Sequence, residues 1–126
     1  KNAGDPMEIV IHGRHADIQE DFKNHVLKQS ARLEKFGVKI ALLDVEVIHR
    51  ENKRQKKVEY LVELTIKGAG TNLRSKSEGP NMDSALDHAM KRLEEQLRRT
   101  ADRRRYHRHR VDSVLSAADV SKLKGI

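Results

Sequence analysis

The sequence predicts an α+β domain in the order β-α-β-β-β-α, with a four-stranded mixed sheet and two helices packed on one face. Four stretches have the apolar clustering or alternation of strands, and two have apolar residues at helical spacing. The order of the stretches is a third observation. A helix between the first two strands permits a parallel, right-handed crossover, and short loops make the later strands antiparallel. Because each helix has one apolar stripe, both should cover the same face of the sheet.

The first strand is predicted over residues 8–12, which are mostly apolar and β-branched. Apolar residues then recur at helical spacing over residues 18–35, which predicts the first helix. We expect Asp17 to cap the start of this helix, with Glu20 in the capping-box position. Gly37 is expected to end the helix.

The next three strands are predicted from alternating patterns. Residues 43–50 and 58–67 alternate between apolar and polar side chains, which is typical of strands with one buried face. The segment 51–57 between them is too polar for a core and contains four basic residues, so it is predicted to be a basic hairpin loop. A weaker strand is predicted over residues 71–78.

Pro80 and Asn81 predict the start of the second helix, with Asn81 as its N-cap. Its apolar stripe runs to Leu97, and its opposite face is basic. After Leu97 the apolar pattern fades while arginines continue to Arg110. We expect the helix to continue there only where those charges are neutralised.

A chain of 126 residues fits one domain with short extensions. We predict a flexible extension over 1–6, the domain over 7–105, and a basic extension with a flexible tail or linker over 106–126. The longest apolar run is far short of the ~18 residues that span a bilayer, so no membrane partner is expected. The absence of cysteine excludes disulfides, thiolate metal sites and a cysteine nucleophile, and favours a cytoplasmic protein.

Positive charge is concentrated in one segment. The net charge is +7, and residues 98–110 hold seven arginines and one aspartate. That leaves 19 of the 26 basic and 18 of the 19 acidic residues for the rest of the chain. Such a concentration favours a polyanionic partner over the alternative, a tail that keeps the protein in solution. Aromatics are scarce and only Tyr106 is expected to be exposed, which favours recognition of folded RNA by phosphate and shape.

Sequence signals of catalysis are weak. We predict that the protein is not an enzyme and that it binds no cofactor, metal ion or small-molecule substrate. Neither a Walker-type loop nor a Gly-x-Ser-x-Gly elbow is present in the sequence. Asp83 and Asp87 are expected to be solvated acids near a helix N-terminus. Two histidine pairs lack a nearby cysteine and lie beside arginines that would repel a cation: His12 with His15, and His107 with His109.

Six segments in order carry a resemblance to a known family: residues 9–14, 33–36, 58–66, 73–77, 81–87 and 91–99. Over about residues 7–105 the chain resembles the ribosome hibernation-promoting factors, which include the ribosome-associated inhibitors. It departs from their usual Asp-Met-Tyr, where this chain has Asn81, Met82 and Asp83. The resemblance does not distinguish a complete short form from a piece of a long form. Ribosome dimerisation is expected only if a further C-terminal domain exists.

The resemblance implies binding to the small ribosomal subunit and its ribosomal RNA, within the 70S ribosome. In the decoding channel the domain would block messenger RNA and transfer RNA in the aminoacyl and peptidyl sites. It would thereby inhibit translation and preserve idle ribosomes under stress and in stationary phase. The RNA contacts so implied are Arg14, Lys28, Arg32, Arg74, Lys76, Lys91, Arg92, Arg98 and Arg99, extended by Arg103, Arg104 and Arg105.

Three other hypotheses stay open at this point. The first is a general structured-RNA-binding or ribosomal protein. The second is an arginine-rich module that binds an acidic protein. The third is an enzyme, such as a nuclease that uses His12, His15 or His107. Nuclease treatment would leave only a protein–protein complex intact.

Overall fold

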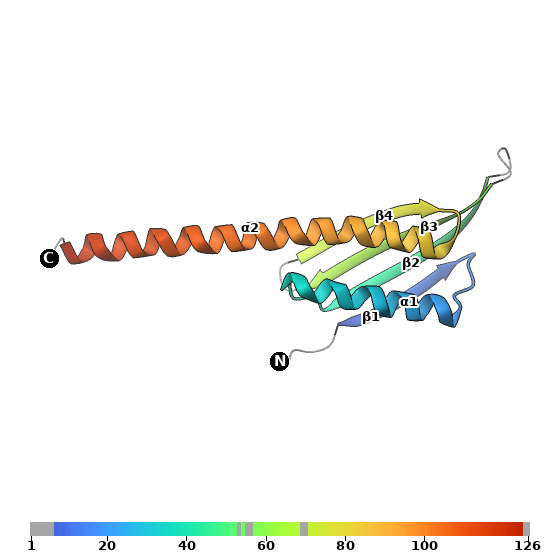
Figure 1. Cartoon of the computed structure of the whole chain (residues 1–126), viewed down its shortest axis with the longest axis horizontal. Helices are drawn as coiled ribbons and strands as arrows, with labels where there is room; N and C mark the ends of the chain where they lie inside the picture. Colours follow the sequence, from blue (N-terminus) through green and yellow to red (C-terminus); the bar gives the residue numbers. More distant parts are fainter. Residues whose placement is uncertain (1–6, 53, 55–56, 69–70, 125–126) are drawn as a thin grey trace.

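A computed structural model describes residues 7–52, 54, 57–68 and 71–124, with the helical backbone alone from residue 108 onward. The predicted order of elements is confirmed (Figure 1). The elements are β1 (Glu8–Arg14), α1 (Glu20–Ser30), a 3-10 helix η1 (Ala31–Phe36), β2 (Leu42–Asn52), β3 (Lys57–Gly68), β4 (Thr71–Gly79) and α2 (Met82–Lys124).

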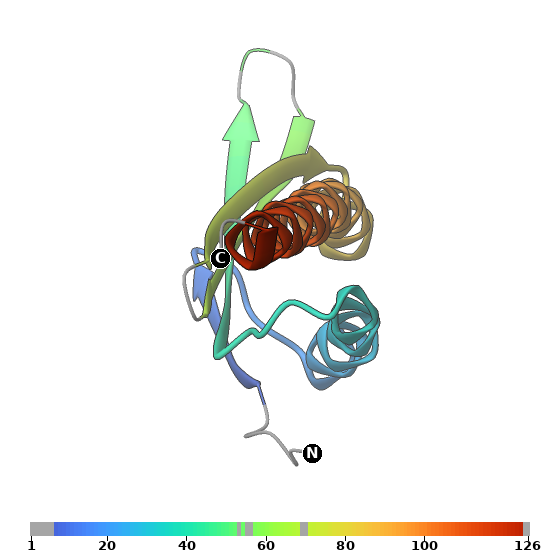
Figure 2. The same ribbon diagram turned by 90° about the vertical axis from the view of Figure 1, so that its left-hand side faces the viewer.

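The strands form one four-stranded sheet in the order β1-β2-β3-β4. β1 pairs with β2 in parallel, and the other two pairs are antiparallel. Both helices cover the same face of this sheet, as Figure 2 shows from the end of α2. The mixed sheet and the one-sided helix layer are therefore as predicted, and no helix of the described residues covers the other face of the sheet.

The core lies between the sheet and the helices. The alternation read in the sequence is confirmed, since Leu43, Val45 and Val47 of β2 are fully buried while the residues between them are not. The other large side chains that are at most 4% exposed are Phe22, Val26, Leu33, Val62, Leu64, Ile66, Leu86, Met90, Leu93 and Leu97.

The predicted start of α1 is wrong. The helix begins at Glu20 and its N-cap is Gln19, whose side chain makes no capping hydrogen bond. Asp17 lies two residues before the cap, too far from the first free backbone N–H groups of the helix. It instead accepts a 2.6 Å hydrogen bond from the side-chain amide of Gln19. The α-helix also ends earlier than predicted, at Ser30, where the chain tightens into η1. Gly37 ends η1 with a left-handed φ of 68°, as its lack of a side chain permits.

α2 is longer than the sequence predicts. Asn81 caps it as expected, since its side-chain oxygen accepts a 2.8 Å hydrogen bond from the Ser84 amide. The helix then continues to Lys124, a length of about 65 Å at 1.5 Å per residue. Ala101 is the last described residue that packs against the core, so the remainder projects from the body as an arm (Figure 1). Neither glycine nor proline interrupts residues 82–124, so backbone propensity sustains the helix where the apolar stripe ends.

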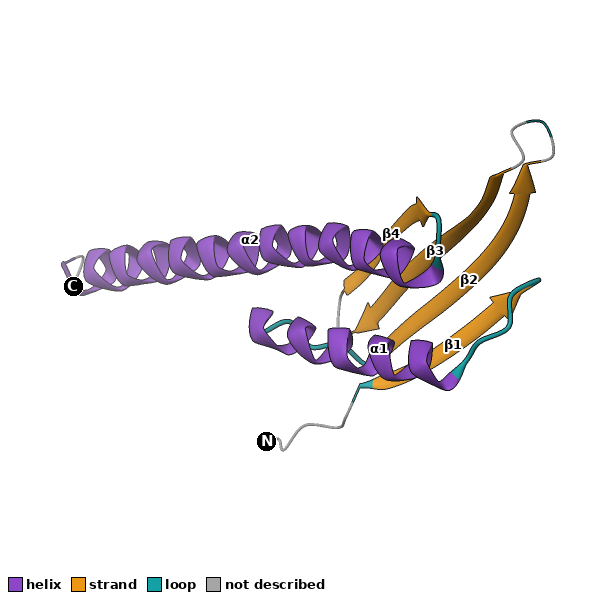
Figure 3. Cartoon of the chain, turned by 45° about the vertical axis from the view of Figure 1, so that its right-hand side comes forward, coloured by secondary structure: helices purple, strands orange, loops and turns teal. Residues whose placement is uncertain are grey.

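β2 and β3 also extend into the predicted hairpin loop, to Asn52 and from Lys57 (Figure 3). Of the loop between them the structure describes residue 54 alone, and the predicted extension 1–6 likewise lies outside the described residues. The division of the chain at residues 6 and 105 stays a prediction.

Candidate nucleic-acid interface

An open groove of about 440 Å³ lies between α2 and the layer formed by α1 and η1. It brings together cations from both helical layers, among them Arg32, Lys91 and Arg98 of the predicted set. Glu94 lies at its base with a side chain only 10% exposed, 3.4 Å from Arg32 and 3.7 Å from Lys35. This carboxylate neutralises part of the local charge and pairs with two long basic side chains that stay 55% exposed.

Phe36, at the end of η1, supports two of these cations. The Lys35 ammonium lies 5.3 Å and the Arg98 guanidinium 5.9 Å from the centroid of its ring. A cation over an aromatic face is attracted by the ring's quadrupole. Phe36 therefore helps to orient two of the cations that line this groove.

One end of the groove is acidic, and its central residue is one that the sequence analysis missed. His25 of α1 lies between two carboxylates of α2, with Nδ1 2.7 Å from Asp83 and Nε2 2.9 Å from Asp87. Gln29 donates a further 3.0 Å hydrogen bond to Asp87. The two acids are solvated as predicted, with side chains 63% and 50% exposed, and in addition they join the two helices through His25. The four-residue spacings of His25 with Gln29, and of Asp83 with Asp87, were the available signal.

We expect His25→Ala to lower the free energy of unfolding by about 1 kcal/mol. The substitution removes the contacts of the imidazole with two carboxylates that are at least half exposed to solvent, which limits their contribution. Chemical denaturation of the two chains would measure the change. Asn24→Ala, at the neighbouring exposed position, is the matched control, and equal losses for the two variants would contradict a helix-joining role for His25.

Three predicted contacts lie on the face of the sheet that has no helices. Arg74 and Lys76 are exposed on β4, alternating with the buried Ser75 and Ser77 that face α2. Arg14 of β1 lies on the same helix-free face. The structure thus separates these three from the cations of the groove.

Acids at the centre of the helix-free face offset its basic edges. Arg14 lies 3.3 Å from Glu46 on β2, and Arg74 lies 4.0 Å from Glu63 on β3. The helix-free face is therefore a weaker candidate for a polyanion than the groove and the arm.

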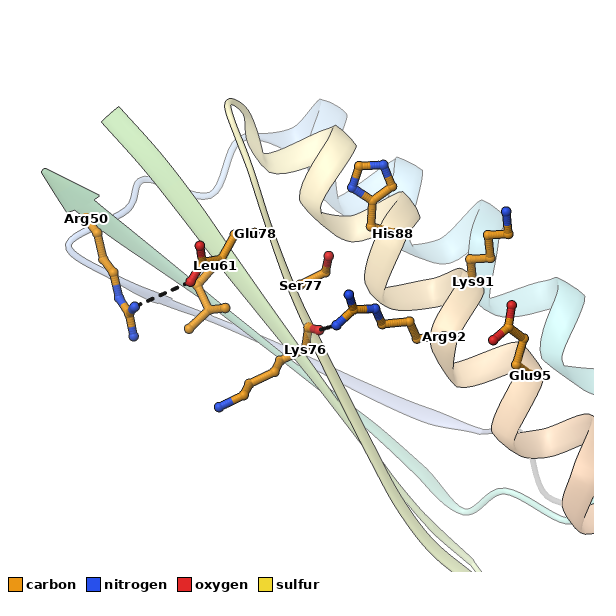
Figure 4. A pocket seen from close by; sticks show the side chains of 9 residues that line it. All are labelled: Arg50, Leu61, Lys76, Ser77, Glu78, His88, Lys91, Arg92 and Glu95. Atoms are coloured by element: carbon orange, nitrogen blue, oxygen red, sulfur yellow. Dashed lines mark hydrogen bonds and ion pairs between the residues drawn. The ribbon is translucent and has the colours of Figure 1, made fainter. Parts of the chain in front are cut away.

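Arg92 contributes to the fold as well as to the surface. Its guanidinium donates a 2.8 Å hydrogen bond to the Lys76 carbonyl of β4, as Figure 4 shows, and Gln96 donates a 2.9 Å bond to the Arg74 carbonyl. β4 is an edge strand, and unpaired carbonyls on an edge invite pairing with another chain. Arg92 and Gln96 therefore cover part of this edge.

We expect Arg92→Ala combined with Gln96→Ala to increase self-association relative to the unchanged chain, because it uncovers two carbonyls of β4. It should also lower the free energy of unfolding by about 2 kcal/mol, at roughly 1 kcal/mol per hydrogen bond. Sedimentation velocity over a concentration series would detect the larger species. Lys91→Ala with Glu95→Ala is the control on the same helix. An unchanged mass distribution for the first pair would show that the edge needs no such cover.

Of the remaining predicted contacts, Lys28 is exposed on α1 and the others lie along α2. Arg98 and Arg99 are exposed where α2 leaves the body. On the arm, Arg103 and Arg105 are exposed, Arg104 is half-buried, and Arg105 lies 3.9 Å from Asp102. Positive charge therefore continues from the groove onto the arm.

Within the described ranges, no cluster of three or more His, Cys, Asp or Glu side chains is arranged to hold a metal ion. His12 lies 3.7 Å from Asp44 in a pair across two strands. No helix of the described part is long and apolar enough to cross a bilayer.

The chain is thus a small α+β domain, β-α-β-β-β-α, with cations gathered in a groove between its helical layers. Residues 9–105 match the family described as sigma 54 modulation protein / S30EA ribosomal protein, and the chain belongs to this family. This confirms the resemblance read from the sequence.

Relatives with curated names agree with that family. The chain is 41% identical over 100 residues to the ribosome hibernation promotion factor of Mycobacterium tuberculosis, an alignment of 79% of this chain and 46% of the relative. It therefore spans about half the length of that protein. It is 29% identical over 112 residues to the ribosome hibernation promoting factor of Pseudomonas putida, covering 89% of this chain and 97% of the relative.

Solved structures agree on the fold. The N-terminal domain of Protein Y from Thermus thermophilus superposes with a TM-score of 0.60 at 25% identity, covering 75% of this chain and 99% of that one. A ribosomal subunit interface protein from Coxiella burnetii gives a TM-score of 0.57 at 22% identity, covering 75% and 97%. The second likeness concerns the fold alone.

Proposed function

We propose that this chain is a ribosome hibernation factor that binds the small ribosomal subunit through its ribosomal RNA. The observation that carries the proposal is the run of exposed cations from the inter-helix groove onto the arm, on the fold of a family whose named relatives are hibernation factors. Arginine suits this role because its planar fork matches phosphate oxygens.

The proposed mechanism is occupation of the decoding channel. A rigid domain whose cations grip phosphates there would exclude messenger RNA and transfer RNA from the aminoacyl and peptidyl sites. Translation would be inhibited and the idle ribosome preserved without any bond being made or broken. In this proposal the protein is cytoplasmic, is not an enzyme and needs no cofactor.

The RNA contacts proposed for this mechanism are those around the groove and its continuation: Lys28, Arg32, Lys91, Arg98, Arg99, Arg103, Arg104 and Arg105. Arg14, Arg74 and Lys76 would contact a second element of the ribosome from the helix-free face of the sheet. Arg92 would reach RNA with the N–H groups that its bond to β4 leaves over. Ribosome dimerisation is proposed only for a chain that carries a further C-terminal domain.

Co-sedimentation with vacant small subunits over a salt series tests the proposal, with messenger RNA and initiator transfer RNA as competitors. We expect saturable binding that both competitors displace. Each phosphate contact should add about 0.7–0.9 to the log–log salt slope. Binding that ignores the competitors, or that equals binding to bulk duplex RNA, would instead favour a general RNA-binding protein.

A further inference from the structure

We propose that Tyr106 stacks on an unpaired base of the RNA that α2 contacts. This inference rests on the proposed function and adds a kind of contact that phosphate-binding arginines cannot make. The chain has four Phe, Trp and Tyr residues in all. Phe22 is core, Phe36 is half-buried beneath two cations, and Tyr60 stacks on His49 with ring centroids 4.8 Å apart.

Tyr106 differs from the other three in its exposure and position. Its side chain is 69% exposed, which leaves ring surface uncovered. It lies on the arm five residues after Ala101, about 7.5 Å beyond the last contact with the core. Packing within the domain therefore does not account for this aromatic side chain.

The surroundings of Tyr106 indicate the ligand. Positions 99, 103 and 106 follow the i, i+4, i+7 spacing that places residues along one face of a helix. Arg99 and Arg103 are exposed there, so two guanidinium groups precede the ring on the same face. Residues 98–110 have seven arginines against one aspartate, which complements a polyanion.

RNA fits this face better than an acidic peptide does. A cationic track that follows the backbone, interrupted by an aromatic ring, is the arrangement by which proteins hold unpaired nucleotides. Every base has a π-face to stack on the ring, whereas a carboxylate side chain has none. The ligand is therefore a phosphate backbone with at least one base free of pairing.

The test compares Tyr106→Ala with Tyr106→Phe on two probes, a synthetic RNA hairpin with an unpaired loop and a fully paired duplex of the same length. Stacking is worth about 1–3 kcal/mol per base, which corresponds to roughly 5- to 150-fold in affinity. We expect Tyr106→Ala to weaken hairpin binding within that range and to leave duplex binding nearly unchanged. Tyr106→Phe keeps the ring and should retain hairpin binding.

A spectroscopic readout separates stacking from a general effect on the helix. The chain has two tyrosines and no tryptophan, so tyrosine emission comes from Tyr60 and Tyr106 alone. Binding of the hairpin should quench the emission of a Tyr60→Phe chain and leave that of a Tyr106→Phe chain almost unchanged. Intensities are corrected for the absorbance of the RNA, since stacking removes emission without changing the lifetime of the unstacked rings.

Two results would overturn the inference: equal affinities of Tyr106→Ala and the unchanged chain for the hairpin, or equal losses on hairpin and duplex. In both cases intact binding to small subunits would leave the proposed function standing. Failure of the unchanged chain to bind any RNA or subunit would overturn both proposals together. If Tyr106→Ala lowered the affinity for polyglutamate as much as the affinity for the hairpin, the arm would be assigned to an acidic protein partner.

Discussion

Leu93→Asp should unfold the domain. Leu93 is fully buried in the middle of the α2 stripe, against the sheet. The substitution removes a large apolar side chain from a closed site and places there a carboxylate without a partner. The two costs together reach about 5 kcal/mol or more, against a total stability of about 5–15 kcal/mol for a typical domain. Thermal denaturation followed by circular dichroism should show no cooperative transition at neutral pH.

The control for this prediction is Leu93→Met, which nearly conserves volume and should cost less than about 1.5 kcal/mol. A cooperative transition in the aspartate variant close to that of the unchanged chain would contradict the placement of α2 on the sheet. Loss of cooperativity in both variants would point to a core less tolerant than its packing indicates.

Lys91→Glu combined with Arg99→Glu should weaken binding to the small subunit by at least about 100-fold without unfolding the chain. Both side chains are exposed on α2, eight residues apart, beside and just beyond the groove. A hydrogen bond to a charged group is worth about 1.5–3 kcal/mol, and each reversal also adds repulsion from phosphate. Arg92 is left unchanged because it covers the β4 edge.

Co-sedimentation over a salt series measures this second effect. If both cations contact phosphate, the log–log slope should fall by about 1.4–1.8. Lys23→Glu with Lys39→Glu makes the same change in net charge at exposed positions outside the groove. Equal losses in the two pairs would mean that overall charge governs binding, and an unchanged affinity in the first pair would remove the groove from the interface.

The fold was predictable because burial leaves a local pattern in the sequence. Alternation in β2 and β3, and apolar residues at helical spacing up to Leu97, predict which faces are covered, and the structure confirms them. The arm was not predictable in this way, since it has no apolar stripe. The helix continues there because residues 82–124 contain neither glycine nor proline. The cap at Asp17 failed because the helix begins two residues after the position that a capping pattern predicts.

The site was predictable only as a list of cations. Which of them lie together depends on pairings between residues distant in the chain. Glu94 holds Arg32 from another helix, His25 is bound by acids 58 and 62 positions away, and Arg92 bonds a backbone carbonyl. Spacing within one helix does not show such partners.

The continuity of α2 across Ala101 gives body and arm a common helical phase. One residue inserted after Ala101 would turn everything beyond it by about 100°, whereas seven would restore the direction to within about 20° and advance it by roughly 10 Å. After the first change the arginines of the arm would point about 100° away from their present direction around the helix axis, and after the second they would point almost where they do now. Binding by the arm therefore depends on the direction of its side chains as much as on their charge, and a deletion in this segment is not equivalent to a substitution.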